Sequence, residues 1–101
     1  MTSATRSEAL PDIPTVGEFV AGYEASTWFG IGAPKNTPAE VVDKLNTEIN
    51  AGLADAELRA RLSKLGGGTI LAGSRADFGK LIADETTKWA KVVKYVGLKL
   101  E

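Results

Sequence analysis

Apolar side chains recur every three or four residues in three stretches of this sequence. That spacing gathers them on one face of an α-helix, so the pattern predicts helices near residues 38–52, 56–65 and 75–96. The three apolar stripes consist of Val41, Val42, Leu45, Ile49 and Leu53; of Leu58, Leu62 and Leu65; and of Phe78, Leu81, Ile82, Trp89, Val92, Val93 and Val96. Glu85 interrupts the third stripe, and we expect Trp89 to lie in the core.

Residues typical of helix ends flank these stretches. Serine, threonine or aspartate at the N-cap accepts hydrogen bonds from the first N–H groups, proline fits the first helical position, and glycine ends a helix. The expected starts are Thr37 with Pro38 and Glu40 in a capping box, Asp55, and Ser74 with Asp77; the expected stops are Gly66 and Gly97. Each predicted helix therefore has its own local start signal.

Two other stretches have the character of β-strands. Residues 23–33 alternate in side and are rich in β-branched and aromatic residues, and Thr69-Ile70-Leu71 forms a shorter run. Residues 1–16 are polar, contain two prolines three positions apart, and are expected to form an extended arm. The order predicts an α/β domain, mostly helical with one or two short strands, whose helix–strand segment is residues 17–101.

Composition then excludes several kinds of chemistry. The 101 residues include 12 basic and 13 acidic side chains, a formal net charge of -1, so no basic surplus is available for nucleic acid. Without cysteine or histidine, the chain has no thiol or imidazole nucleophile, no usual zinc site and no disulfide. The paired carboxylates lie on helices that also carry lysine or arginine and are interpreted as solvated faces. We therefore expect no enzyme activity, no metal site and no cofactor.

The glycine run Gly66-Gly67-Gly68 lacks the context of a phosphate-binding loop. Such a loop needs a lysine and a serine or threonine after it, or a strand before it and a helix directly after it. Here a helix is predicted before the run and a strand after it. We interpret the run as a helix end followed by a turn.

The stretch Trp28-Phe29-Gly30 is the best candidate for a binding site. Two large aromatic side chains next to a glycine at the end of a strand can line a pocket. The alternative is that one ring belongs to the core and the other covers a helix. The residue types alone leave both interpretations open.

The N-terminal residues and the lengths of the apolar runs bear on targeting and membrane insertion. The polar start Met1-Thr2-Ser3-Ala4-Thr5-Arg6 leads into no apolar segment of the kind found in secretory signals. No run approaches the ~18–20 apolar residues that span a bilayer. We expect the polypeptide as given to be soluble.

Taken in order, several short motifs resemble one family, the tripartite tricarboxylate transporter receptors or Bug proteins. Each motif is short, and their order and spacing over almost the whole chain carry the resemblance. They are Thr5-Arg6-Ser7, Leu10-Pro11-Asp12-Ile13-Pro14-Thr15, Gly22-Tyr23-Glu24, Trp28-Phe29-Gly30, Ala33-Pro34, Thr37-Pro38, Leu45-Asn46, Glu85-Thr86-Thr87-Lys88-Trp89 and Gly97-Leu98-Lys99.

The resemblance implies a periplasmic binding protein of the type II kind, with two α/β lobes around a cleft. Such receptors capture small carboxylates and pass them to a membrane permease. Residues 1–101 would be the C-terminal third, without the signal peptide and without most of the cleft. The resemblance also places four residues at the rim of the cleft, where ligands bind at strand ends: Thr27, Trp28, Phe29 and Gly30.

Two further expectations follow. The strand over residues 23–33 would be an uncovered sheet edge, through which the fragment could self-associate. The alternative to a receptor fragment is a free-standing, non-catalytic interaction module derived from the same fold. Whether the natural reading frame extends upstream of Met1 would distinguish them, and neither the identity of the carboxylate nor the origin of Leu100-Glu101 follows from the sequence.

Overall fold

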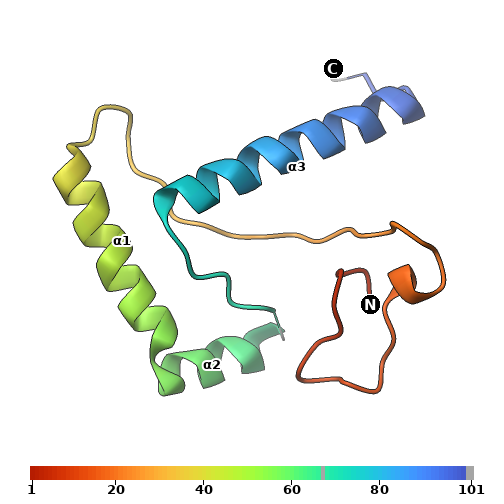
Figure 1. Cartoon of the computed structure of the whole chain (residues 1–101), viewed down its shortest axis with the longest axis horizontal. Helices are drawn as coiled ribbons and strands as arrows, with labels where there is room; N and C mark the ends of the chain where they lie inside the picture. Colours follow the sequence, from red (N-terminus) through yellow and green to blue (C-terminus); the bar gives the residue numbers. More distant parts are fainter. Residues whose placement is uncertain (67, 100–101) are drawn as a thin grey trace. The chain divides into compact units, whose positions relative to one another are not determined.

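A computed structural model describes residues 1–66 and 68–99, and its regular structure is helical throughout these residues (Figure 1). The elements are the single 3-10 turn η1 (Val16–Glu18) and the helices α1 (Ala39–Ala54), α2 (Ala56–Gly66) and α3 (Arg75–Val96). The chain divides into two compact units, Met1–Leu71 and Ala72–Glu101, and each is described by itself. The middle of the predicted glycine turn, Gly67, and the residues Leu100-Glu101 lie outside the described residues.

The first predicted helix is confirmed, but its predicted cap is wrong. The Thr37 hydroxyl donates to the carbonyl of Pro34 at 2.8 Å and is therefore used in a turn before the helix. The helix begins after Pro38, whose carbonyl accepts the N–H groups of Val41 and Val42 at 3.0 and 3.1 Å. No side chain caps this end, so the capping box expected with Glu40 does not form.

The junction between α1 and α2 follows the sequence prediction. Asp55 interrupts the helical path, and its Oδ1 accepts the N–H of Leu58 at 2.9 Å, as expected of an N-cap. The two helices pack against each other across the sharp turn visible in Figure 1. A Cβ on Gly52 would lie 3.7 Å from Leu58 Cδ2, so this glycine sits where the helices meet.

Both ends of α3 also follow the prediction. Ser74 Oγ accepts the N–H of Asp77 at 3.1 Å, and Asp77 Oδ2 accepts the N–H of Ser74 at 2.8 Å, which completes a capping box. The hydrogen bonds from the Ser74 N–H and hydroxyl lower the pKa of the Asp77 carboxyl. At the other end, Gly97 is left-handed with φ 68°, and its N–H reaches the carbonyl of Lys94.

The predicted strands are wrong for this chain, because the described residues contain no β-strand. Residues 23–33 have no regular structure, and their alternation finds no neighbouring strand. Ala25 donates its N–H to the carbonyl of Thr2 at 2.8 Å, a single bond rather than a ladder. Residues 69–71 are likewise irregular. A strand is defined by pairing, so strand-like residues without a partner segment remain extended loop.

The described part of the chain has no buried apolar side chain, and its one buried residue is Thr15, 3% exposed. Trp89, expected in the core, is 41% exposed. None of the described helices is both long and apolar enough to cross a membrane.

Replacing the glycine inside α3 and the glycine at its C-cap should change helix stability in opposite directions. A Cβ on Gly79 would meet nothing within 4 Å, so Gly79→Ala should stabilise α3 by about 1 kcal/mol. Gly97 holds a positive φ, so Gly97→Ala should fray the last turn. Far-ultraviolet circular dichroism at 222 nm should show a helical signal that rises in the first variant and falls in the second. Equal changes in both would contradict the assignment of the helix end.

Candidate ligand-binding site

The four predicted site residues lie together in the irregular stretch that precedes α1. Thr27, Phe29 and Gly30 are exposed, and Phe29 retains 97% of its accessible surface. Trp28 is partly buried. The two neighbouring rings therefore have different environments, and the Phe29 ring is presented to solvent. The segment offers a hydroxyl, two aromatic faces and a backbone that belongs to no sheet.

The N-terminal arm holds the start of this stretch in place through its first two residues. The carbonyl of Met1 accepts the N–H of Val16, and the carbonyl of Thr2 accepts the N–H of Ala25, both at 2.8 Å. The N-terminal ammonium donates to the carbonyl of Pro14 at 2.9 Å. Residues far apart in sequence are thus joined, although the arm contains no regular element before η1.

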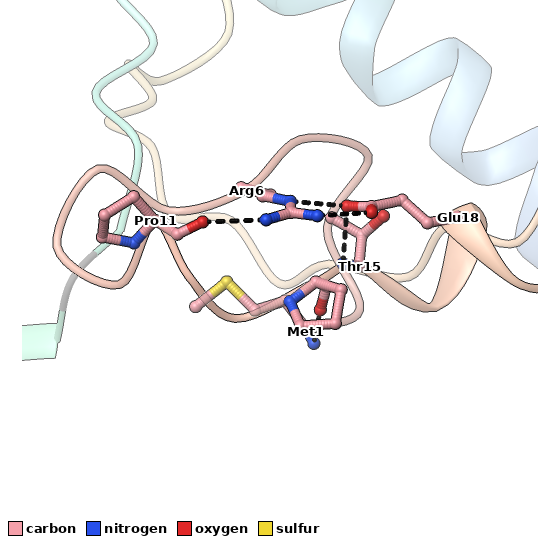
Figure 2. A network of polar contacts seen from close by, with 6 residues as sticks. Met1, Arg6, Pro11, Thr15 and Glu18 are labelled. Carbon is pink, nitrogen blue, oxygen red and sulfur yellow. Dashed lines mark hydrogen bonds and ion pairs between the residues drawn. The ribbon is translucent and has the colours of Figure 1, made fainter.

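A bidentate ion pair closes the arm on itself. Arg6 Nε lies 2.7 Å from Glu18 Oε1, and Arg6 Nη2 lies 2.6 Å from Glu18 Oε2 (Figure 2). The third guanidinium nitrogen, Nη1, donates to the carbonyl of Pro11 at 3.0 Å. Glu18 Oε1 also accepts the N–H of Thr15 at 3.1 Å. The planar guanidinium fork therefore ties the proline loop to η1.

These contacts set the charge state of the pair. Hydrogen bonds from Arg6, and then the N–H of Thr15, lower the pKa of Glu18 from 4.5 to about 2. The same contact with Glu18 raises the pKa of Arg6. Both side chains are still about half exposed, so solvent screens their attraction. The pair contributes mainly to the geometry of the arm.

Glycine allows the chain to turn back after η1. A Cβ on Gly17 would lie 3.0 Å from the carbonyl oxygen of Tyr23, closer than a side chain tolerates without a shift. Gly22 has a φ of 79°, in the left-handed region that favours glycine. Together these two glycines direct Tyr23 back along η1, so the arm determines where the Thr27–Gly30 segment begins.

The sequence interpretation missed the ion pair between Arg6 and Glu18, although one signal was present. Thr15-x-x-Glu18 has the spacing of a capping box, and the hydrogen bond from the Thr15 N–H to Glu18 is one half of that motif. Arg6 is twelve residues distant from Glu18, and no local rule links them. Arg6 entered the sequence analysis through the motif Thr5-Arg6-Ser7 and not as a partner of Glu18.

An open hollow also occurs within the first unit, away from the predicted site residues. Its lining joins the arm to α2 and the residues that follow it, and consists of Ser7, Glu8, Ala9, Arg59, Ala60, Ser63, Gly68, Thr69 and Ile70. Among the residues that the structure describes, no three potential metal ligands of the histidine, cysteine, aspartate or glutamate type gather.

One family model and several known proteins match nearly the whole of this chain. The model of the family described as "Tripartite tricarboxylate transporter family receptor" matches residues 1–98. The chain is 38% identical over 95 residues to the "UPF0065 protein in tcbD-tcbE intergenic region" of Pseudomonas sp. (strain P51). It is 35% identical over 102 residues to "Protein BugT" of Bordetella pertussis. No solved structure matches significantly.

The matches cover nearly all of this chain but only part of each relative. The aligned regions take in 92% and 98% of this chain, and 28% and 30% of the two relatives. A UPF0065 protein of Bordetella bronchiseptica is 31% identical over 99 residues, which cover 98% of this chain and 29% of that relative. The chain therefore spans less than a third of the length of these curated relatives and corresponds to their C-terminal segment.

The pKa of Glu18 predicts how the arm responds to acid. Because that pKa is about 2 in the folded arm and 4.5 ordinarily, the contribution of the carboxylate is complete above about pH 4.5 and is lost as the pH falls through about 2. Carbon-13 NMR titration of the Glu18 carboxyl should give a midpoint near 2. Arg6→Gln should raise it toward 4.5, whereas Arg61→Gln, which removes the separate ion pair with Glu57, should leave it unchanged. A midpoint near 4.5 in the unaltered chain would contradict the ion pair.

Proposed function

Because this chain belongs to the tripartite tricarboxylate transporter receptor family, we propose that it forms the C-terminal part of an extracytoplasmic solute receptor. That receptor captures a small carboxylate in the periplasm and delivers it to a membrane permease. The observation that carries the proposal is the family match over residues 1–98. A binding role without catalysis is in keeping with the family, whose members are receptors.

The exposed apolar surface supports the view that further polypeptide completes the fold. All three helices have apolar stripes, yet no apolar side chain among the described residues is buried. The three relatives cited above are each more than three times as long as the region aligned with this chain. In a two-lobe receptor, the remaining residues would cover these stripes and supply the other wall of the cleft.

Within that receptor we assign the cleft rim to Thr27, Trp28, Phe29 and Gly30. The exposed Phe29 ring would close one side of the ligand, and the Thr27 hydroxyl and neighbouring N–H groups could donate to a carboxylate. Gly30 leaves room for a carboxylate or a bridging water to approach the backbone. The arm, fixed by Arg6 and Glu18, would hold the start of this segment.

A free-standing interaction module is the second function class. It would need a core of its own, and the described residues contain no buried apolar side chain. That observation favours the receptor over the module. A coding region upstream of Met1 that includes a signal peptide would support the receptor, and its absence would support the module.

We also propose that the chain, taken alone, self-associates. The sequence located this tendency in a strand over residues 23–33, but that strand does not form in the structure. A reason for association nevertheless remains, because no apolar side chain among the described residues is buried. Burying these side chains against a second copy would remove them from water.

The first functional prediction concerns ligand binding by the chain alone. Since one wall of the cleft would be missing, isothermal titration calorimetry with succinate, malate, citrate or aspartate should show no binding in the micromolar range. A receptor that contains this segment and both lobes should bind its carboxylate. Micromolar binding by the 101-residue chain itself would overturn the proposed role of the missing lobe.

The second functional prediction separates two exposed aromatic side chains in a complete receptor containing this segment. Phe29→Ala should raise the carboxylate dissociation constant about tenfold or more, because it removes one wall of the site. Phe19→Ala removes another exposed ring, directly after η1, and should leave the constant within about twofold. Equal effects of the two substitutions would reject Phe29 as a site residue.

A further inference from the structure

Helix α3 carries an apolar stripe along its length, interrupted by Glu85. The side chains at helical spacing along it are each partly or half exposed, and they are Phe78, Leu81, Ile82, Trp89, Val92, Val93 and Val96. The helix has 22 residues, which corresponds to about 33 Å of length. A stripe of this kind stabilises a helix only when another surface covers it.

The one charged residue within the stripe, Glu85, is paired inside the helix. Its Oε2 accepts the indole N–H of Trp89 at 2.8 Å, and its Oε1 lies 3.2 Å from Lys88 Nζ. The Glu85 side chain is only 14% exposed. Lys88 Nζ also lies 5.6 Å from the centre of the Trp89 ring, within range of a cation–π interaction.

These contacts make the Trp89 ring suitable for burial in an interface. The only polar atom of the indole already has its acceptor, so burial of the ring leaves no unpaired N–H group. The carboxylate already has a cation beside it, so the stripe as a whole carries no net charge. A large ring whose polar atom is satisfied is the kind of side chain that anchors protein interfaces.

The charges along α3 favour one direction of pairing between two such helices. Residues 75–85 contain three acidic and two basic side chains, whereas residues 86–96 contain three lysines and no acidic residue. A parallel pair would bring the two lysine-rich halves together. An antiparallel pair places each lysine-rich half against the net acidic half of the other helix.

We infer that α3 is the surface through which two copies of this chain associate, as an antiparallel pair with Trp89 as its anchor and Glu85 as the residue that positions it. This inference rests on the self-association proposed above. Because the pairing has two-fold symmetry, the same stripe serves both copies.

Sedimentation equilibrium over a concentration series tests the surface. The unaltered chain should be dimeric, and Trp89→Ala should raise the dimer dissociation constant at least tenfold while helix content by circular dichroism is kept. Ile31→Ala alters an exposed side chain of the 23–33 stretch and should change that constant less than twofold. A chain that stays monomeric overturns both this inference and the proposed self-association. A dimer weakened by Ile31→Ala and not by Trp89→Ala overturns the assignment to α3 alone.

Two further measurements test the roles of Glu85 and of helix direction. Glu85→Ala should weaken the dimer at least tenfold, and Glu85→Gln, which keeps an acceptor for the indole N–H, should recover most of the loss; equal losses would reject the positioning role. Since the chain has no cysteine, a single spin label at Ala76→Cys reports direction. An antiparallel pair should separate the two labels by about 30 Å or more, and a separation under about 20 Å would contradict it.

Discussion

One constraint governs the rest of the structure: the described residues bury no apolar side chain. Burial of apolar surface is the main favourable term in folding, and a chain with so little of it relies on individual polar contacts. These contacts include the Ser74–Asp77 capping box, the Asp55 cap between α1 and α2, and the Arg6–Glu18 ion pair of the arm. Each fixes a short segment, but none can replace a core. The apolar stripes of the three helices therefore remain partly exposed to solvent.

The lack of buried apolar side chains also explains which parts of the structure could be predicted from sequence. The three helices and the ends of α3 follow from signals that lie within a few residues, and they were predicted correctly. The strands over residues 23–33 and 69–71 were not, because a strand requires a second segment to pair with. Trp89 has the spacing of a core residue and yet is half exposed, because spacing describes a face and not its cover. The Arg6–Glu18 pair joins residues twelve apart, beyond the reach of any local rule.

At the candidate site, the sequence identified a stretch and the structure adds its surroundings. Phe29 is presented to solvent while Trp28 is partly buried; alternation places these neighbours on opposite sides of the stretch but does not say which side is covered. The arm determines how this stretch begins, through Met1, Thr2 and the close approach of Gly17 to Tyr23. Under the proposed function, this stretch would take part in solute capture. The role of Thr27–Gly30 at the rim of a cleft stays a prediction.

Under the proposed function, further polypeptide covers the apolar stripes of a chain whose described residues bury no apolar side chain. Differential scanning calorimetry of the chain, at a concentration low enough to keep it monomeric, tests this most directly. We expect a broad change without a cooperative heat-absorption peak, and a small heat-capacity increase. A sharp two-state transition, with a heat-capacity increase near the ~1.2–1.5 kcal/mol/K typical of a folded domain of about this size, would contradict it.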